Sequence, residues 1–541
     1  MSGTKEILQG KMVSVKVKKD MIHIKCKVRA SLCDTYTCKE LRLLYRTDDE
    51  KRKQEFALPF ISRKETKNYI TFRSILDLKE VKLKPMHWDF RLVATKGDQT
   101  FYIVLKNPSY LNYAKYCLLF FENKYEYGDG MFVYPYVSAK REFSLQYREK
   151  AEYDDYRIKL KERLAVIRFV LTYPWLRHKR IFLVYEKFCC MAQDNGFYFF
   201  KYCMEHDMEK KLNRSIFYVI DKRAMDRDRL NPYGKKVIDF MSVRHLTYGL
   251  AARLLISSES KTHIYARVKG SALAPLIKRK KAVFLQHGVI GLKKITTFQK
   301  WDIGASNMFV VSADFEKNIV KQHFGYEEEE LALTGLARWD VLKDCSNGSK
   351  EILIMPTWRN WLENSSDEFF KNSSYYKNYM ELLQSEELKE VLKKYDLKFN
   401  FYIHPKFNEY MKNFALEHEE RVCLTPFGQE PLNEIIMRCK MLITDYSSVS
   451  WDMLYMKKPV IFFQFDYDDY MRQNGSYMDL KKELLGERVE SVDNLLQIIE
   501  NYADNGFTLR KEYEKKHPSY FKYIDHNNSK RICEEIMRRG F

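Results

Sequence analysis

The sequence has 541 residues, too many for a single hydrophobic core, so we expect two to four domains. Hydrophobic residues make up 45% of the chain, which excludes a generally disordered protein. The formal net charge of +20 predicts an anionic partner: a nucleic acid, a phosphorylated polymer, a nucleotide or a membrane surface.

The eleven cysteines contain no CxxC pair, a pattern that favours reduced thiols over a disulfide framework or a zinc site. The N-terminal sequence MSGTKEILQGKMVSVKVKKD has no apolar signal-peptide core. No apolar run approaches the roughly 20 residues that span a bilayer. We therefore expect a soluble or peripheral protein.

Residues 1–150 differ from the rest of the chain because apolar and polar residues alternate over long stretches. Examples are MVSVKVKKDMIHIKCKVRA and WDFRLVAT. Alternation with a period of two predicts half-buried strands, and we expect a small antiparallel β-sandwich. No set of catalytic residues is apparent in this region, so the sequence indicates an accessory domain.

The stretch 156–180 is basic and helical in pattern, with sequence YRIKLKERLAVIRFVLTYPWLRHKR. One interpretation is a helix that lies on a membrane surface and attracts anionic lipid. The other is a buried helix that links two domains. The buried linker is the favoured interpretation of the two.

Two successive series of apolar runs follow, and their spacing suits strands that alternate with helices. This pattern predicts two Rossmann-like domains with a cleft between them, over residues 151–330 and 331–541. The expected strands of the first series are 181–185, 215–220, 254–257, 282–286 and 309–311. Those of the second are 331–333, 352–355, 399–403, 422–424, 441–443 and 460–463.

The stretch 441–465, MLITDYSSVSWDMLYMKKPVIFFQF, predicts a strand, a turn, a helix and a second strand. The turn contains Asp445, Ser447 and Ser448, and the serines precede the expected helix. Hydroxyls and unpaired backbone N–H groups at that place favour an anion. The alternative is that one serine only caps the helix.

Polar residues follow several other expected strands, where open α/β sheets bind ligands. His287 comes after 282–286 and is followed by Gly288, Gly291 and Lys293. A histidine beside glycines and lysines suits proton transfer next to a phosphate, although each residue alone also fits a structural role. The other strand-end residues are Arg338, Thr357, Trp358, Arg359 and His404.

Taken in order, the motifs QHG…LKK, TGLARWDVL, PTWRN, IHP and ITDYSSVSWD…KKPVIFF resemble the CDP-glycerol glycerophosphotransferase family of teichoic acid synthesis. The resemblance covers residues 180–485 and implies a GT-B-like pair of Rossmann-like domains, with the nucleotide held by the second. Gln286 stands where the family more often has an aromatic residue. Such departures bear on the polyol and the acceptor more than on the reaction.

The resemblance implies that His287 is the general base on the acceptor hydroxyl and that His404 is a second essential histidine near the diphosphate. It also implies a CDP-polyol pocket. The expected substrate-binding residues are Gly288, Lys293, Arg338, Thr357, Trp358, Arg359, Asp445, Ser447, Ser448 and Asp452. No metal ligand is assigned, but Asp445 and Asp452 leave room for a divalent ion.

The implied reaction is attack of an acceptor hydroxyl on the β-phosphate of CDP-glycerol or CDP-ribitol, with release of CMP. The expected partners are a lipid-linked or glycan acceptor and an anionic membrane surface. The expected location is the cytoplasm, peripheral to the inner face of the cell membrane. The oligomeric state is not predicted.

Two other functions fit parts of the sequence. A GT-B glycosyltransferase would use a nucleotide sugar and release a nucleoside diphosphate instead of CMP. A basic nucleic-acid-binding protein would use stacking aromatics, but no such motif is present, and nucleic acid is not an expected partner.

Overall fold

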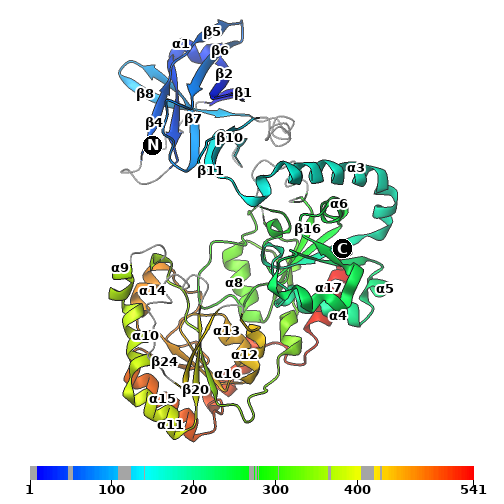
Figure 1. Ribbon diagram of the computed structural model, residues 1–541, viewed down its shortest axis with the longest axis vertical. Coiled ribbons are helices and arrows are strands. Elements are labelled where there is room, and N and C mark those ends of the chain that lie inside the picture. Colours follow the sequence, from blue (N-terminus) through cyan, green and yellow to red (C-terminus); the bar gives the residue numbers. More distant parts are fainter. Residues whose placement is uncertain are drawn as a thin grey trace. The chain divides into compact units, whose positions relative to one another are not determined.

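The chain divides into two compact units in the computed structural model (Figure 1). Unit 1 comprises Met1–Leu164 with Ala266–Leu276, and unit 2 comprises Ala165–Tyr265 with Ile277–Phe541. The structure describes residues 9–46, 53–107, 123–138, 141–266, 273, 277, 279–302, 304–362, 367–403, 420–426 and 429–541. Within these residues no helix is both long enough and apolar enough to cross a membrane.

Unit 1 contains an 11-stranded sheet in the order β5-β6-β2-β1-β8-β7-β11-β10-β9, with β3 paired to β7 and β4. All pairs are antiparallel except β1 with β8. The expected alternation is present, since every second residue of β2 is buried. The strands are β1 Gln9–Lys18, β2 Met21–Arg29, β3 Thr37–Tyr45, β4 Glu55–Leu58, β5 Ser62–Glu65, β6 Tyr69–Asp77, β7 Met86–Lys96, β8 Gln99–Lys106, β9 Tyr125–Glu126, β10 Met131–Val137 and β11 Phe143–Glu149.

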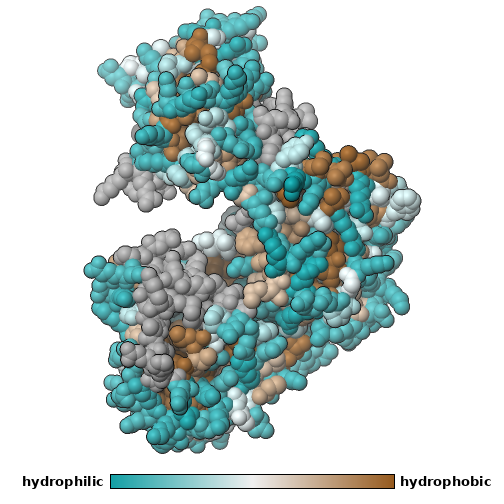
Figure 2. All heavy atoms as spheres, in the orientation of Figure 1, coloured by the Kyte–Doolittle hydropathy of each residue, from teal (hydrophilic) through white to brown (hydrophobic). Residues whose placement is uncertain are grey.

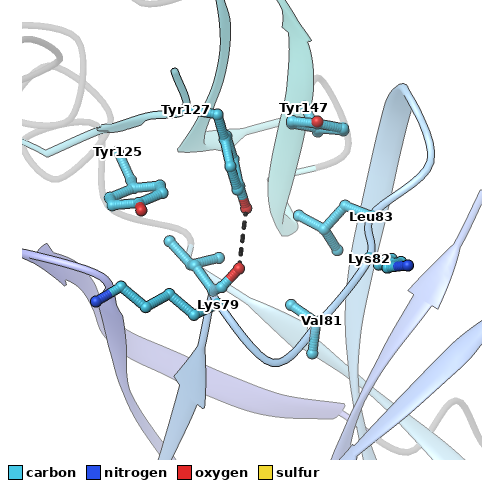
Figure 3. A pocket seen from close by; sticks show the side chains of 8 residues that line it. Lys79, Val81, Lys82, Leu83, Tyr125, Tyr127 and Tyr147 are labelled. Carbon is cyan, nitrogen blue, oxygen red and sulfur yellow. Dashed lines mark hydrogen bonds between the residues drawn. The ribbon is translucent and has the colours of Figure 1, made fainter. Parts of the chain in front are cut away.

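A cavity of about 420 Å³ opens in unit 1 between the segment that joins β6 to β7 and the strands β9 and β11 (Figure 3). Tyrosine, lysine and aliphatic side chains line it.

Helix α3, Tyr156–Lys179, begins in unit 1 and ends in unit 2, and it confirms the helix predicted for this stretch. The favoured interpretation is wrong about burial, because most of the large apolar side chains of α3 face solvent. The helix does link two compact units, as that interpretation expected. Leu171 and Trp175 are 72% and 71% exposed. Figure 2 shows hydrophobic side chains gathered along α3.

The first sheet of unit 2 is parallel throughout, in the order β14-β13-β12-β15-β16-β17-β18. Each central strand is a continuous run of apolar residues, because the strands of such a sheet are buried on both faces by helices. Every residue of β12 is buried. The strands are β12 Ile181–Tyr185, β13 Ser215–Ile220, β14 Val237–Asp239, β15 Leu254–Ser257, β16 Lys281–Phe284, β17 Met308–Val311 and β18 Leu331–Leu333.

The second sheet of unit 2 is also parallel, in the order β21-β20-β19-β22-β23-β24. Its strands are β19 Glu351–Ile354, β20 Lys398–Ile403, β21 Val422–Pro426, β22 Met441–Thr444, β23 Val460–Phe463 and β24 Glu487–Val489. Helix α13, Val449–Tyr455, joins β22 to β23 as predicted. The mixed α/β class with parallel sheets is therefore confirmed.

The end of the chain packs against residues near the first sheet. Helix α17, Asn528–Arg538, contacts helix α4, Asn195–Glu205, and the guanidinium of Arg214 donates to the carbonyl of Phe541 at 2.6 Å. The backbone N–H groups of Asn528 and Ser529 donate to the carboxylate of Asp340. These bonds fix the segment that contains Arg338.

Candidate active site

His287 lies just beyond the carboxyl end of β16, in a loop whose backbone is strained. Gln286 has a φ of 68°, which is a left-handed backbone conformation. This conformation is energetically unfavourable for a residue other than glycine. The Gln286 amide is 1% exposed and donates from Nε2 to the carbonyl of Val310 and to Glu316, both at 2.8 Å. While Gln286 is fixed inward, the next side chain, His287, is 63% exposed.

Glu316 holds the rest of this loop from helix α8, Asp314–Phe324. Its carboxylate is fully buried and accepts hydrogen bonds from the backbone of Ile290 at 2.6 Å and of Ser312 at 2.7 Å. Burial raises the pKa of Glu316 despite these donors. The loop is therefore tied to the body of the first sheet at both sides of His287.

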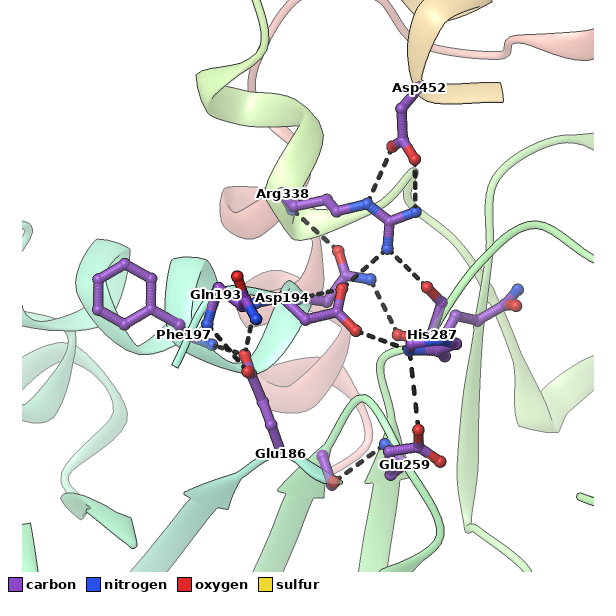
Figure 4. A network of polar contacts seen from close by, with 11 residues as sticks. Glu186, Gln193, Asp194, Phe197, Glu259, His287, Arg338 and Asp452 are labelled. Atoms are coloured by element: carbon purple, nitrogen blue, oxygen red, sulfur yellow. Dashed lines mark hydrogen bonds and ion pairs between the residues drawn. The ribbon is translucent and has the colours of Figure 1, made fainter. Parts of the chain in front are cut away.

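Asp194 orients the imidazole of His287 (Figure 4). Nδ1 of His287 lies 3.0 Å from Oδ2 of Asp194, which is the N-cap residue of α4. Glu186 accepts the backbone N–H of Asp194 at 2.9 Å and that of Phe197 at 2.7 Å, so the cap is fixed from the end of β12. Glu259 lies 3.7 Å from the same nitrogen of His287.

The two carboxylates determine the titration of His287. Partial loss of hydration where the imidazole faces the protein acts to lower the pKa of His287, but the hydrogen bond and charge of Asp194, with the charge of Glu259, raise it overall. Burial likewise acts to raise the pKa of Asp194, and Arg338 and His287 hold it below its usual value. Donation from Nδ1 to Asp194 leaves Nε2 as the nitrogen that can accept a proton.

Arg338 connects Asp194 to helix α13 of the second sheet. Its Nε and Nη2 donate to the two oxygens of Asp452 at 2.9 and 3.0 Å, and its Nη1 donates to Asp194 at 2.8 Å. Nη1 also donates to the carbonyl of His287 at 2.8 Å. The guanidinium thus holds the histidine loop in place. The N–H groups of Arg338, which were predicted to contact the donor, are bonded to protein groups.

Gly288 brings the histidine loop against the turn that carries the two serines. A Cβ atom at Gly288 would lie 2.5 Å from Oγ of Ser448, so a side chain at this position would displace the serine. Farther along the same loop, the carbonyl of Gly291 accepts the backbone N–H of Tyr477 at 3.0 Å, in the segment that follows helix α14 (Tyr467–Gln473). Residues that end strands of both sheets are therefore side by side.

Arg359 and Asp445 lie in a buried ionic cluster and not at a surface. Arg359 is 0% exposed; its Nη1 lies 2.8 Å from Asp445, and its Nε donates to Asp466 at 2.6 Å. Asp445 also accepts the backbone N–H of Thr357 at 2.9 Å. Arg359 and Asp445, which were both predicted to contact the donor, thus each pair with a protein group of opposite charge.

The remaining predicted residues occupy the neighbouring turns. Thr357 is half-buried, and its hydroxyl oxygen is buried without a hydrogen-bond partner among the described residues. Ser447, Ser448 and Lys293 are half-buried, and Trp358 is buried in the core of the second sheet. His404 lies outside the described residues.

Sequence reasoning missed Asp194, Glu186, Glu259 and Asn195. Asn195 is fully buried; its side-chain amide donates to the carbonyl of Gln286 at 2.8 Å and accepts the backbone N–H of Arg338 at 2.9 Å. One local signal was available, because an aspartate before an apolar helix is a typical N-cap. The proximity of Asp194 to His287, however, depends on the order of strands in the sheet.

Among the described residues, no group of three or more histidine, cysteine, aspartate or glutamate side chains could hold a metal ion. Asp445 pairs with Arg359, and Asp452 pairs with Arg338. The two aspartates considered for a divalent ion are therefore each engaged by a guanidinium.

A histidine held by a carboxylate at the carboxyl ends of a parallel sheet suits an enzyme that uses acid–base catalysis. The sequence profile of one such family, described as CDP-Glycerol:Poly(glycerophosphate) glycerophosphotransferase, matches residues 167–538. This match covers most of the chain, and the chain belongs to that family.

Curated relatives carry names from teichoic acid synthesis. The chain is 30% identical over 366 residues to the minor teichoic acid biosynthesis protein GgaB of Bacillus subtilis, covering 64% of this chain and 38% of that protein. It is 28% identical over 249 residues to the teichoic acid ribitol-phosphate polymerase TarK of Staphylococcus aureus, covering 42% and 45%. The chain thus spans less than half the length of these two relatives.

Among solved structures, the wall teichoic acid polymerase TagF is similar at 17% identity and a TM-score of 0.47. The similarity covers 70% of this chain and 98% of that one.

Proposed function

We propose that this protein transfers glycerol phosphate or ribitol phosphate from a CDP-polyol to a hydroxyl of a lipid-linked or glycan acceptor, with release of CMP, in the synthesis of a teichoic-acid-like polymer. Family membership supports the reaction class. The observation that carries the proposal is the pairing of His287 with Asp194 beside the Ser448 turn.

In this proposal, Nε2 of His287 takes the proton of the acceptor hydroxyl as that oxygen attacks the β-phosphate. Asp194 fixes the ring and stabilises the imidazolium that forms. Arg338 keeps Asp194 in place and carries no direct contact to the donor. Phosphoryl transfer depends mainly on positioning and charge stabilisation, which suits a site braced in this way.

The donor-binding residues in this proposal are Ser447, Ser448, Thr357 and Lys293, with Gly288 allowing the close approach of the loops. We assign Arg359, Asp445, Asp452 and Trp358 to the framework that shapes these turns. His404 retains its proposed role near the diphosphate, on the basis of the family motif alone.

The domain organisation belongs to the same proposal. Residues 1–150 form an accessory β-sandwich, and 151–330 and 331–541 form a GT-B-like pair of Rossmann-like domains. The acceptor binds to the first of the pair and the CDP-polyol to the second. The two parallel sheets of unit 2 support this division.

We also propose that the protein acts in the cytoplasm, peripheral to the inner face of the membrane, through α3. Val170, Leu171 and Trp175 are exposed on this helix, and Arg168, Arg177 and Lys179 lie near them in sequence. Exposed apolar side chains interspersed with basic ones are the pattern of a helix that inserts shallowly into an anionic surface.

The experiment that tests the function supplies CDP-glycerol, CDP-ribitol or a nucleotide sugar, each with and without a lipid-linked primer. Release of CMP and extension of the primer with one CDP-polyol are the expected results. Release of a nucleoside diphosphate from the nucleotide sugar, with no reaction of either CDP-polyol, would instead identify a glycosyltransferase.

A further inference from the structure

The cavity in unit 1 is lined by tyrosine, lysine and aliphatic side chains, none of which belongs to the candidate active site (Figure 3). One wall is the segment after β6, and the other is formed by tyrosines of β9, β11 and the residue that follows β9. The lining residues are Leu78, Lys79, Val81, Lys82, Leu83, Tyr125, Tyr127 and Tyr147.

The three tyrosines form a continuous aromatic array. The rings of Tyr125 and Tyr127 are 4.8 Å apart at 88°, and those of Tyr127 and Tyr147 are 5.2 Å apart at 68°. All three are half-buried, so part of each ring remains accessible from the cavity. Aromatic rings at the surface bind the C–H faces of a ligand while their hydroxyls bind its polar groups.

The walls of the cavity are fixed in place by hydrogen bonds. The hydroxyl of Tyr127 donates to the carbonyl of Leu78 at 3.5 Å, and the backbone N–H of Leu78 donates to the carbonyl of Asp20 at 2.8 Å. The side chain of Gln54 donates to the carbonyl of Lys82 at 3.0 Å. A site that is already formed has little ordering cost on binding.

The charges at the rim select the sign of the ligand. Lys79 and Lys82 are both exposed, and Lys79 is paired with Asp20 at 2.7 Å. A tyrosine array without these lysines would suit a quaternary ammonium ion. Because Asp20 offsets the charge of Lys79, the ammonium group of Lys82 is the one that opposes a cation at the array and favours phosphate oxygens.

We propose that this cavity binds an anionic chain in which phosphodiesters alternate with hydroxylated carbon units. The C–H groups of those units lie on the tyrosines, and a phosphate lies at the lysines. This inference rests on the proposed function, because such a chain is the class of acceptor or product that a polyol-phosphate transferase handles. The accessory unit then carries a polymer-binding site of its own, in addition to the catalytic residues of unit 2.

The test measures binding of four probes to the full chain by calorimetry: poly(glycerol phosphate), neutral dextran, inorganic polyphosphate and oligo(dT). Poly(glycerol phosphate) should bind at least roughly tenfold more tightly than each of the other three. Dextran has no phosphate, polyphosphate has no carbon units, and the sugars within oligo(dT) have no free hydroxyls. Equal or tighter binding of oligo(dT) would contradict the assignment and indicate a nucleic-acid site.

Two substitutions separate the two chemistries. Tyr125→Ala should weaken poly(glycerol phosphate) binding roughly five- to tenfold and reduce its preference over polyphosphate. Lys82→Gln should weaken it several-fold and reduce its preference over dextran. The matched controls are Tyr69→Ala and Lys64→Gln, which are exposed elsewhere on unit 1 and should change nothing.

Unchanged affinity in both cavity variants would overturn the proposal, and so would an equal loss in the two controls. Transfer from a CDP-polyol to a short soluble acceptor, measured on the same samples, should be normal in Tyr125→Ala and Lys82→Gln. If the unsubstituted protein shows no such transfer, the proposed function fails, whereas the probe measurements still decide whether the cavity binds the polymer.

Discussion

Asp194 and His287 are 93 residues apart in sequence, yet Oδ2 of the first lies 3.0 Å from Nδ1 of the second. Strand β15 lies between β12 and β16 in the sheet, and both residues follow carboxyl ends of its strands. The parallel arrangement of the strands therefore brings together a carboxylate and an imidazole that belong to different βα units.

Asp194→Asn should lower kcat roughly a hundredfold, because the imidazole loses its orientation and the imidazolium its counter-charge. The same change should move the acid limb of the kcat/KM profile to lower pH. His287 acts as a base only when its imidazole is neutral, so the acid limb follows the pKa of His287. Asp194 raises that pKa, and removal of its charge should therefore lower both the pKa and the pH of the acid limb. Asp504→Asn, at an exposed position, is the control. An acid limb that stays in place would contradict the pairing.

Arg338→Ala should destabilise the protein by about 3–5 kcal/mol, because the buried carboxylate of Asp452 is left without its partner. Arg472→Ala removes an exposed ion pair with Asp469 and should cost less than about 1 kcal/mol. Denaturant unfolding followed by circular dichroism measures both. The double variant Arg338→Ala/Asp452→Ala should lose less than the sum of its single changes, and strict additivity would show that the pair is not coupled.

Ser448→Ala should raise the KM for the CDP-polyol roughly ten- to a hundredfold while kcat at saturating donor stays near normal. The reason is that a hydroxyl bonded to a phosphate stabilises the bound donor and the transition state alike. Steady-state kinetics provide the measurement, and Ser519→Ala, exposed on α16 (Lys511–Tyr520), is the control. A normal KM would remove Ser448 from the donor site.

Much of unit 2 could be predicted because its strands are continuous apolar runs. Strands β12, β13, β15 and β23 have the predicted bounds. Strands β14 and β24 were missed, since each has three residues and includes a charged one, Asp239 or Glu487. Strands that short pair only because neighbouring strands are already in place.

The candidate site was predictable only where a residue follows its own strand. His287, Ser447 and Ser448 carry that local signal. Asp194 carried only the signal of a helix cap, and the burial of Arg359 between two carboxylates depends on tertiary packing. An arginine at a strand end looks the same in sequence whether it contacts a ligand or a buried aspartate.

Substitution of Leu171 and Trp175 by glutamate should reduce binding to anionic vesicles, because both side chains are exposed on α3. Sedimentation at low and high salt measures the effect, and high salt should also weaken binding of the unsubstituted protein. Met225→Glu, at another exposed apolar position, is the control. Equal binding to neutral and anionic vesicles would refute the electrostatic part of this account.

The role of His287 as general base is tested most directly by the transfer rate of His287→Ala, measured with its donor affinity on the same sample. We expect a kcat about 10²- to 10⁴-fold lower, because a general base has been removed. We also expect near-normal CDP-polyol binding by calorimetry, since the donor is assigned to the turns of the second sheet. Near-normal turnover in this variant would show that another group takes the proton, and the assignment of His287 would be wrong.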